Sequence, residues 1–386
     1  MMKRITILGS TGSIGQSALD VIAAHPDRFE IVALGAGRNI DLLVKQIERF
    51  HPRFVIVQSE QETAALKDRI PHPEFEISFG SDGMEQAAGF GENDVVLNAL
   101  VGAVGLTVSL AAVRAGKFLA LANKESLVVG GPLFADLMRQ GDGRILPVDS
   151  EHSAIWQCLK AGRQDEVSRL WLTASGGPFR QRDAATFKDI TVEEALAHPT
   201  WKMGPKITID SATMINKGLE LIEAVWLFSL PPDRVRIVIH PQSVVHSMVE
   251  YIDSAIIAQM SSPDMRLPIT YALFWPERIE SDFGQIDLTQ VGPLEFCPPD
   301  EAKFPALRLA RQAAEAGGTA PAALNAANEI AVELFLSGRI TFPGITELIE
   351  EILVKHNVVH NPELEDILTC DRETRRLARE LAGSSR

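Results

Sequence analysis

From Ile5 to Val148 the chain alternates short, continuous apolar runs, rich in β-branched residues, with segments of helical periodicity. Continuous apolar strands separated by helices are typical of a parallel sheet that is covered on both faces. The pattern therefore predicts a doubly wound, Rossmann-like α/β domain over residues 1–149. The expected strands are ITILG, EIVALG, FVIV, DVVLNAL, FLALAN and ILPV, with helices expected at Ile14–Ala24 and Ile40–Phe50.

After Asp149 the pattern changes. One strong helix is expected near Ala212–Phe228, and the last three of five strand-like runs follow each other without helices, which favours an α+β domain with partly antiparallel pairing over residues 150–274. A proline-rich linker is expected over 275–305 and a helical domain over 306–386, interrupted at Gly317–Pro321, Gly338, Pro343 and Pro362. The five strand-like runs are LWLTAS, KITID, RVRIVIH, SVVHSMVEY and SAIIAQM.

Composition narrows the class of partner. The 386 residues are 46% hydrophobic, enough for two or three cores, and carry a formal charge of −14 without a long block of like charge. Nucleic acid and anionic membranes are therefore not expected partners. No apolar run reaches the roughly 20 residues of a membrane span. The opening MMKRITILGS enters a strand pattern at once, without the apolar core of a signal peptide, and three widely spaced cysteines form no metal motif. A cytoplasmic location is expected.

A glycine turn follows the first strand. Gly9, Gly12 and Gly15 lie between ITIL and a helix, where backbone amides at the helix start face a pyrophosphate. The spacing is GxxGxxG, and such a turn also occurs for structural reasons, but its place at the start of the βαβ series favours a dinucleotide site. Thr11 and Ser13 add hydroxyl donors.

The tip of the second strand indicates which dinucleotide is bound. NAD-binding proteins usually carry an acid there, whereas this strand ends in Gly35-Ala36-Gly37-Arg38-Asn39. A guanidinium offers a charge-assisted bond to a 2′-phosphate that a carboxylate would repel. The position favours NADP(H), although Arg38 is also compatible with a solvated residue at a helix start.

Two carboxylates follow the strand ILPV. Asp149 and Glu151 stand at i and i+2, on one side of the chain if the strand geometry continues, and at the edge where α/β ligand sites lie. Converging carboxylates require a cation, and oxygen ligands favour Mg²⁺ or Mn²⁺. The alternative, that DSEH only caps the start of a helix, stays open at this level.

A second constellation begins the strong helix. Asn216, Lys217 and Glu220 share one helical face, while LELIEAVWLF supplies an apolar face. Lys–Glu pairs at this spacing are commonly surface ion pairs. Here Ser211, Asn216 and Lys217 together offer the donors that a phosphate dianion requires, and Glu220 is a candidate third metal carboxylate.

Three further loops carry polar residues. Ser175-Gly-Gly-Pro offers a hydroxyl and amides to a phosphate, or simply turns the chain. The stretch His198–Gly204, with Trp201, suits a closing lid, although a structural histidine fits equally well. Asn123-Lys124-Glu125 follows the strand FLAL, where the nicotinamide end of a cofactor should arrive, and Lys124 is a candidate contact to a substrate hydroxyl.

Taken together and in this order, six motifs resemble the 1-deoxy-D-xylulose 5-phosphate reductoisomerase family over essentially the whole chain. VDSEHSA and SATMINKGLE are the most specific, and Arg38 stands where some members have lysine. The other motifs are GSTGSIG, LANKES, ASGGPF and HPQSVVHSMVEY, and HPTWKMGPKITID runs directly into SATMINKGLE.

The resemblance implies a homodimeric enzyme with an N-terminal NADPH domain, a catalytic domain, a linker and a C-terminal helical domain. It implies proton-transfer or catalytic roles for Lys124, Glu151 and His198, and a Mg²⁺, Mn²⁺ or Co²⁺ site at Asp149, Glu151 and Glu220. The implied NADPH contacts are Thr11, Gly12, Ser13, Ile14, Gly37, Arg38, Asn39, Asn123, Glu125 and Gly204. The implied sugar-phosphate contacts are Lys124, Ser150, Glu151, Ser175, His198, Trp201, Ser211, Asn216, Lys217 and Glu220.

The implied chemistry is a carbon–carbon rearrangement of 1-deoxy-D-xylulose 5-phosphate followed by hydride reduction to 2-C-methyl-D-erythritol 4-phosphate. A bound metal would stabilise the developing oxyanion charge as a Lewis acid. Two other classes remain: an NADP-dependent dehydrogenase without isomerisation, whose activity would survive EDTA, and an NADP-sensing module, which would bind cofactor without turnover.

Overall fold

The chain forms two compact units, and the computed structural model describes residues 2–139, 144–197 and 204–384. Neither unit is one continuous stretch, because the chain leaves each of them and returns. Unit 1 comprises Met1–Ser126, Phe134–Ser153 and Asp264–Gly284, and unit 2 comprises Leu127–Leu133, Ala154–Pro263 and Gln285–Arg386.

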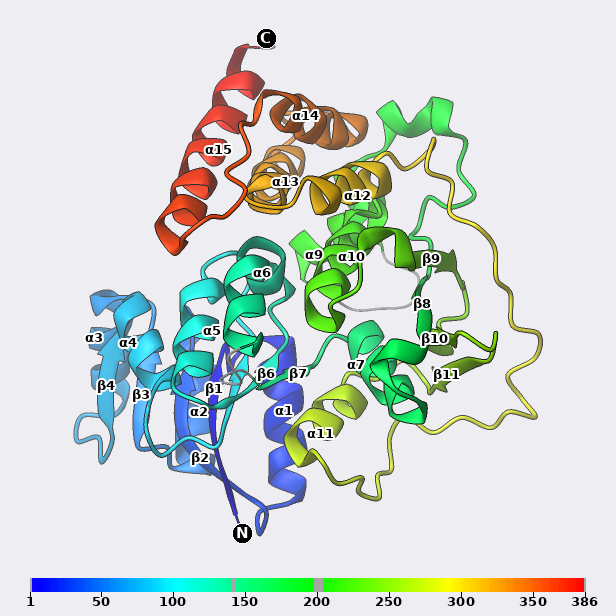
Figure 1. Cartoon of the computed structure of the whole chain (residues 1–386). Helices are drawn as coiled ribbons and strands as arrows, with labels where there is room; N and C mark the ends of the chain where they lie inside the picture. Colours follow the sequence, from blue (N-terminus) through cyan, green and yellow to red (C-terminus); the bar gives the residue numbers. More distant parts are fainter. Residues whose placement is uncertain (1, 140–143, 198–203, 385–386) are drawn as a thin grey trace. The chain divides into compact units, whose positions relative to one another are not determined.

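Unit 1 is built on a parallel sheet. In the part of the chain that the structure describes it has seven strands in the order β4-β3-β2-β1-β5-β6-β7 (Figure 1). The chain winds outward from β1 in one direction and then from β5 in the other, so the strand order reverses between β1 and β5. The strands are β1 Lys3–Leu8, β2 Phe29–Gly35, β3 Phe54–Val57, β4 Glu76–Phe79, β5 Val95–Asn98, β6 Phe118–Leu121 and β7 Arg144–Pro147.

Helices connect these strands, and the predicted Rossmann-like fold is confirmed. The central strands are apolar because both faces of the sheet are covered: Ile5 and Ile7 on β1 and Leu97 on β5 are fully buried. β4 was not expected, since its short sequence EISF is only half buried. The connecting helices are α1 Ser13–Ala24, α2 Ile40–Phe50, α3 Glu60–Arg69, α4 Gly80–Ala88, α5 Gly105–Arg114 and α6 Lys124–Arg139, and α7 Ser150–Cys158 follows β7 and continues into unit 2.

A late segment completes unit 1. Helix α11 (Arg266–Phe274) packs on α1, and Phe274 meets Phe29 with ring centroids 4.7 Å apart. Lys3 Nζ donates hydrogen bonds to the carbonyl oxygens of Leu273 at 2.9 Å and Trp275 at 2.7 Å. The domain boundaries drawn from the sequence stay a prediction, and this segment lies outside the 1–149 range assigned there to the first domain.

Unit 2 contains a mixed sheet, as the α+β pattern predicted. Its four strands, counted over the described ranges, have the order β11-β10-β8-β9; β8 is parallel to β9, and β10 is antiparallel to both β8 and β11. Helix α10 is the strong helix expected from the sequence. The elements are β8 Val167–Ala174, α8 Val192–Leu196, α9 Pro205–Ala212, α10 Ile215–Phe228, β9 Val235–Ile239, β10 Val245–Tyr251 and β11 Ile256–Met260.

The strand expected at KITID is wrong, because these residues lie within α9. Five mixed apolar and polar residues are compatible with the period of a strand or of a helix. The residues typical of a helix start favour the helix. Gly204 caps α9, Pro205 occupies its first turn, and Lys206 pairs with Asp210 at the helical i, i+4 spacing, 2.8 Å apart.

The C-terminal helices, gold to red in Figure 1, pack beside one another. Their breaks fall where glycine and proline were expected to interrupt the helices. Residues 275–305, all of them described, contain no helix or strand of their own beyond a single bridge between Cys297 and Ile239, and their role as a linker stays a prediction. The helices are α12 Ala306–Ala316, α13 Ala320–Leu336, α14 Phe342–Lys355 and α15 Leu364–Ser384.

Within the described ranges, none of the helices combines the length and apolar character that crossing a bilayer requires.

Candidate active site

The glycine turn after β1 is sterically restricted to glycine at two positions. Gly9 has φ of +93°, and a Cβ there would lie 2.5 Å from the Ala99 carbonyl oxygen in the loop after β5. A Cβ at Gly15, in the first turn of α1, would lie 2.3 Å from the Gly9 carbonyl oxygen. The turn therefore packs tightly at the point where the strand order reverses, which is where open α/β sheets bind ligands.

The start of α1 is open for a ligand. Gly12 is its N-cap and provides no side-chain cap, and Gly12 and Ser13 are exposed while Thr11 and Ile14 are partly exposed. The first amides of a helix lack intrahelical acceptors, so they can donate to a phosphate.

The loop after β2 is exposed to solvent and carries Arg38. Gly37, Arg38 and Asn39 are all exposed beyond the buried strand end. Asn39 Oδ1 accepts from Leu42 N at 3.1 Å and so caps α2, which leaves the Arg38 guanidinium as the cationic group of this loop.

A buried polar network fixes the loop that follows β5. Asn98 donates to Ser109 Oγ at 2.7 Å, and Ser109 donates to Ser126 Oγ at 3.2 Å. Ser126 donates to Asn123 Oδ1, and Asn123 in turn donates to the carbonyl oxygens of Leu100 at 3.0 Å and Gly102 at 2.9 Å. Asn123 thus shapes the loop that contacts the glycine turn.

Lys124 begins α6 and forms a buried ion pair with Asp149. Its Nζ lies 2.5 Å from Asp149 Oδ2, and the side chains are only 9% and 12% exposed. The two residues follow the neighbouring strands β6 and β7, so both lie at the carboxyl edge of the sheet that carries the glycine turn. Glu125, also buried, accepts from Asn123 Nδ2 at 3.2 Å.

The expected strand geometry at Asp149 and Glu151 is wrong, because α7 begins at Ser150. Ser153 N donates to the Asp149 carbonyl oxygen at 2.8 Å, so Asp149 stands at the helix start and the helix-cap alternative describes the backbone correctly. A helix start still leaves carboxylates available to a ligand. Ser150 Oγ donates to Glu151 Oε2 at 2.6 Å, and both residues are partly exposed.

In unit 2, the shared face of α10 is confirmed, and it is not a surface ion pair. Asn216 Nδ2 donates to Glu220 Oε1 at 2.5 Å, and Lys217 Nζ pairs with Glu220 Oε2. The Lys217 and Glu220 side chains are 6% and 1% exposed. A buried ion pair of this kind is a costly arrangement for stability alone, which favours a functional role.

The Ser175 loop lies against the C-terminal end of α9. Gly176 and Gly177 have φ of +87° and +68°, which confirms a glycine turn, and Ser175 Oγ accepts from Gly177 N at 3.3 Å. A Cβ on Gly177 would lie 2.7 Å from the Ser211 carbonyl oxygen. The glycine turn that follows Ser175 is therefore packed closely against the backbone of Ser211.

His198 and Trp201 lie outside the described residues. Gly204, expected to contact NADPH, is the exposed N-cap of α9. Sequence reasoning did not single out Asn98, Ser109 or Ser126, although a polar residue at the end of the buried run DVVLN was a usable signal.

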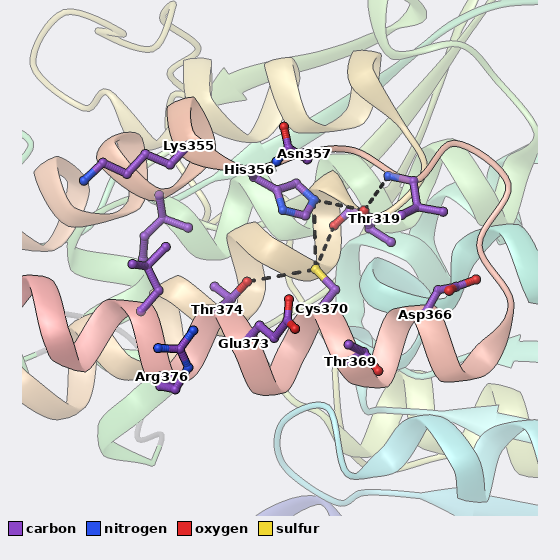
Figure 2. Close-up of a pocket in the computed structure, with 13 residues that line it drawn as sticks. Thr319, Lys355, His356, Asn357, Asp366, Thr369, Cys370, Glu373, Thr374 and Arg376 are labelled. Atoms are coloured by element: carbon purple, nitrogen blue, oxygen red, sulfur yellow. Dashed lines mark hydrogen bonds between the residues drawn. The ribbon is translucent and has the colours of Figure 1, made fainter.

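A cavity of about 330 Å³ lies among the C-terminal helices, with Cys370, His356, Thr319 and Thr374 along it (Figure 2). The Thr319 hydroxyl is 2.9 Å from His356 Nε2, and the Cys370 thiol donates to the Thr319 carbonyl oxygen at 3.6 Å. Burial lowers the pKa of His356 and raises the pKa of Cys370 to about 11. Both groups are therefore neutral near pH 7.

Family models match most of the chain. The model described as 1-deoxy-D-xylulose 5-phosphate reductoisomerase matches residues 5–131, and its C-terminal domain model matches 145–228. A further model, the DXP reductoisomerase C-terminal domain, matches 260–377.

Full-length relatives give the same result. The 1-deoxy-D-xylulose 5-phosphate reductoisomerases of Chlorobaculum tepidum and Geobacter metallireducens are 51% and 50% identical, with 99% and 100% of this chain and the whole of each relative covered. The Zymomonas mobilis enzyme solved with NADPH has a TM-score of 0.93 at 44% identity, covering 99% of both chains. A DOX-P reductoisomerase solved with NADPH, fosmidomycin and magnesium also has 0.93, at 42% identity over 99% of this chain and 98% of that one.

A parallel sheet with a glycine turn at the reversal of strand order defines a Rossmann-like, dinucleotide-binding class of α/β protein. Within that class, the matched models and the full-length identity show that the chain belongs to the 1-deoxy-D-xylulose 5-phosphate reductoisomerase family.

Proposed function

We propose that this chain isomerises and reduces 1-deoxy-D-xylulose 5-phosphate to 2-C-methyl-D-erythritol 4-phosphate with NADPH and a divalent metal, in the non-mevalonate route to isoprenoid precursors. The observation that carries the proposal is the buried Lys124–Asp149 pair at the same sheet edge as the glycine turn. Hydride donor and substrate then meet at one edge. The relatives solved with NADPH, and with fosmidomycin and magnesium, support the same ligand set.

NADPH is assigned to the open helix start and the loops at the carboxyl edge of the sheet. The amides at the start of α1 hold the pyrophosphate, and Arg38 pairs with the 2′-phosphate. The bound cofactor supplies the hydride. The assigned contacts are Thr11, Gly12, Ser13, Ile14, Gly37, Arg38, Asn39, Asn123, Glu125 and Gly204.

The metal is assigned to Asp149, Glu151 and Glu220. A set of three carboxylates supplies hard oxygen ligands, which fits Mg²⁺, Mn²⁺ or Co²⁺ better than a structural zinc. When bound, the metal stabilises negative charge that develops on substrate oxygens. Lysines already compensate two of these carboxylates, because Lys124 pairs with Asp149 and Lys217 with Glu220.

The chain's own residues orient the sugar phosphate. Ser211, Asn216 and Lys217, with the Ser175 turn, hold the phosphate, whose binding energy positions the reacting carbons. At the other end Ser150 and Lys124 bind hydroxyl groups, and Lys124 and Glu151 are the candidate proton-transfer groups. The roles expected for His198 and Trp201 stay predictions.

We also propose that the protein is a homodimer that pairs through unit 2. β11 is an edge strand of the mixed sheet, and Ile256 and Ile257 on it are 52% and 38% exposed, with Ile252 beside it 69% exposed. Exposed apolar edge strands favour association. Sedimentation should give a dimer, and Ile256→Lys with Ile257→Lys should shift it towards monomer; a wild-type monomer contradicts the proposal.

A cytoplasmic location is the matching proposal for the compartment. Cys158 and Cys370 are buried as free thiols, and a reducing compartment keeps thiols in this form. Fractionation of the native host tests it, and recovery with secreted proteins would contradict it.

The deciding experiment supplies 1-deoxy-D-xylulose 5-phosphate, NADPH and Mn²⁺ or Mg²⁺, and follows the loss of nicotinamide absorbance. Turnover that stops with EDTA and returns with metal supports the proposal. Metal-independent oxidation would indicate a simple dehydrogenase, and cofactor binding without turnover would indicate a sensor.

A further inference from the structure

A buried carboxylate joins α9 to the C-terminal helices. Asp210 is 1% exposed, and its Oδ1 accepts from Asn328 Nδ2 at 2.9 Å. Asn328 lies on α13, 118 residues later, and is fully buried. Lys206 pairs with the other oxygen, Oδ2, at 2.8 Å. Hydrogen bonds to a buried charged group are among the stronger ones in proteins.

Asp210 stands at the corner that presents the phosphate-binding residues. Ser211 follows it directly, and α9 ends one residue later. Met214 then takes φ of +65° and α10 begins, so Asn216 and Lys217 lie within seven residues of Asp210. A shift in the end of α9 therefore changes the position of Ser211 relative to Lys217.

A second contact supports the other arm of this corner. Gly218 follows Lys217 on α10, and a Cβ there would lie 2.5 Å from Ala310 Cβ and 3.4 Å from the Ala306 carbonyl oxygen, both on α12. Only glycine permits this approach of α12. Each arm of the corner thus rests on a different C-terminal helix.

We infer that α12 and α13 support the phosphate-binding corner and that Asn328 is a positioning residue, which acts on phosphate binding through Asp210. The inference rests on the proposed function, because it needs the phosphate to bind at Ser211, Asn216 and Lys217. It gives the C-terminal helices a role in substrate affinity as well as in stability.

The same helix contains a matched control. Asn325 is also fully buried on α13, and its Nδ2 donates to Glu329 on that helix at 2.9 Å. Neither Asn325 Oδ1 nor Asn328 Oδ1 has a hydrogen-bond partner within the described ranges. The two asparagines therefore share type, burial and helix, and only Asn328 reaches α9.

The test compares Asn328→Ala with Asn325→Ala in the full-length protein. For Asn328→Ala we expect KM for 1-deoxy-D-xylulose 5-phosphate to rise roughly tenfold, with KM for NADPH unchanged within about twofold. The dissociation constant of inorganic phosphate, measured by calorimetry, should rise by the same factor. Asn325→Ala should leave both substrate constants near those of the wild type even if it lowers Tm equally.

Asn328→Asp with Asp210→Asn supplies the rescue. Asn328→Asp alone places two carboxylates together and should weaken phosphate binding, whereas the double variant restores one donor and one acceptor and should recover most of the loss. Equal effects of the two alanine variants, a matching rise in KM for NADPH, or no rescue would overturn the inference. Absence of wild-type turnover would instead reject the proposed function, and phosphate calorimetry would still test the role of Asn328.

Discussion

Lys217 and Glu220, one turn apart on α10, form an ion pair whose side chains are 6% and 1% exposed. Asn216 donates to the second oxygen of the same carboxylate, so the chain itself binds both oxygens of Glu220. In the proposed metal site, a carboxylate held in this way would be oriented before the metal binds, which limits the reorganisation needed on binding.

Glu220→Gln should lower metal-dependent turnover by about 100-fold or more, the size typical of losing a group that stabilises developing charge. NADPH affinity, measured by fluorescence titration, should stay within about twofold of the wild type. Glu351→Gln is the control, because Glu351 forms an ion pair with Lys355 one helical turn away on α14, but that pair is exposed to solvent. Equal loss of turnover and NADPH binding would show that Glu220 serves the fold.

Gly9→Ala should lower the free energy of unfolding through two separate effects. The positive φ contributes about 1–2 kcal/mol of strain and overlap with the Ala99 carbonyl adds about 1–3 kcal/mol, with NADPH affinity falling as the turn shifts. Gly116→Ala is the control, because Gly116 has φ of +69° with open space around it and meets only the strain. Urea unfolding measures the loss of stability and NADPH titration the loss of affinity. Equal losses in Gly9→Ala and Gly116→Ala would contradict the close approach of the Gly9 turn to the loop after β5.

Arg38→Ala should raise KM for NADPH about 10- to 100-fold, which corresponds to one lost charge-assisted bond. KM for NADH should change little, so the ratio of the two constants isolates the 2′-phosphate. Lys45→Ala removes an exposed charge from α2, the helix that follows this loop, and serves as the control. Similar shifts for both cofactors would place the 2′-phosphate elsewhere.

Thiol reactivity should separate the three cysteines. Cys297 is exposed, whereas Cys158 and Cys370 are buried, and burial raises the pKa of Cys370 to about 11. Since the thiolate is the reactive form, one thiol should react quickly with Ellman's reagent at pH 8 and the other two only in denaturant. Three fast thiols in the native protein would contradict the packing around Cys370.

His356 should make the protein less stable in mild acid. Burial lowers its pKa in the folded state, so the unfolded chain binds the proton first as pH falls below the ordinary value of 6.5. The contribution of the neutral His356 to the free energy of unfolding is fully present above pH 6.5, and it is lost as pH falls through the folded-state pKa. Tm measured from pH 8 to pH 5 should decline less in His356→Gln than in the wild type; parallel declines would show that another group is responsible.

The sequence predicted the first sheet well because its strands are continuous apolar runs, and such runs are buried on both faces wherever they pair. The runs ITIL, EIVAL and FVIV clearly indicated buried strands, whereas EISF, which is only half buried, lacks a continuous apolar run. The strand predicted at KITID is wrong because five residues do not distinguish the period of a strand from that of a helix. Pro205 in the first turn and the i, i+4 spacing of Lys206 and Asp210 both favour the helix.

The chemistry of the site was visible in residue types and spacing, but its burial was not. The Lys217–Glu220 spacing is that of an ordinary surface pair, and only packing shows that it is buried. The network of Asn98, Ser109 and Ser126 joins residues 11 and 17 positions apart, and the Asp210–Asn328 bond spans 118. No local pattern specifies contacts of that range.

The helix α11 places a condition on how the protein is made. Unit 1 includes Asp264–Gly284, so the parallel sheet is synthesised long before α11. Only this later segment supplies the carbonyl oxygens that accept the hydrogen bonds of Lys3. The apolar surface of α1 that α11 covers stays exposed while more than a hundred residues of unit 2 are translated. A gene fragment that stops near residue 150 therefore encodes the parallel sheet without α11, the helix that packs on α1.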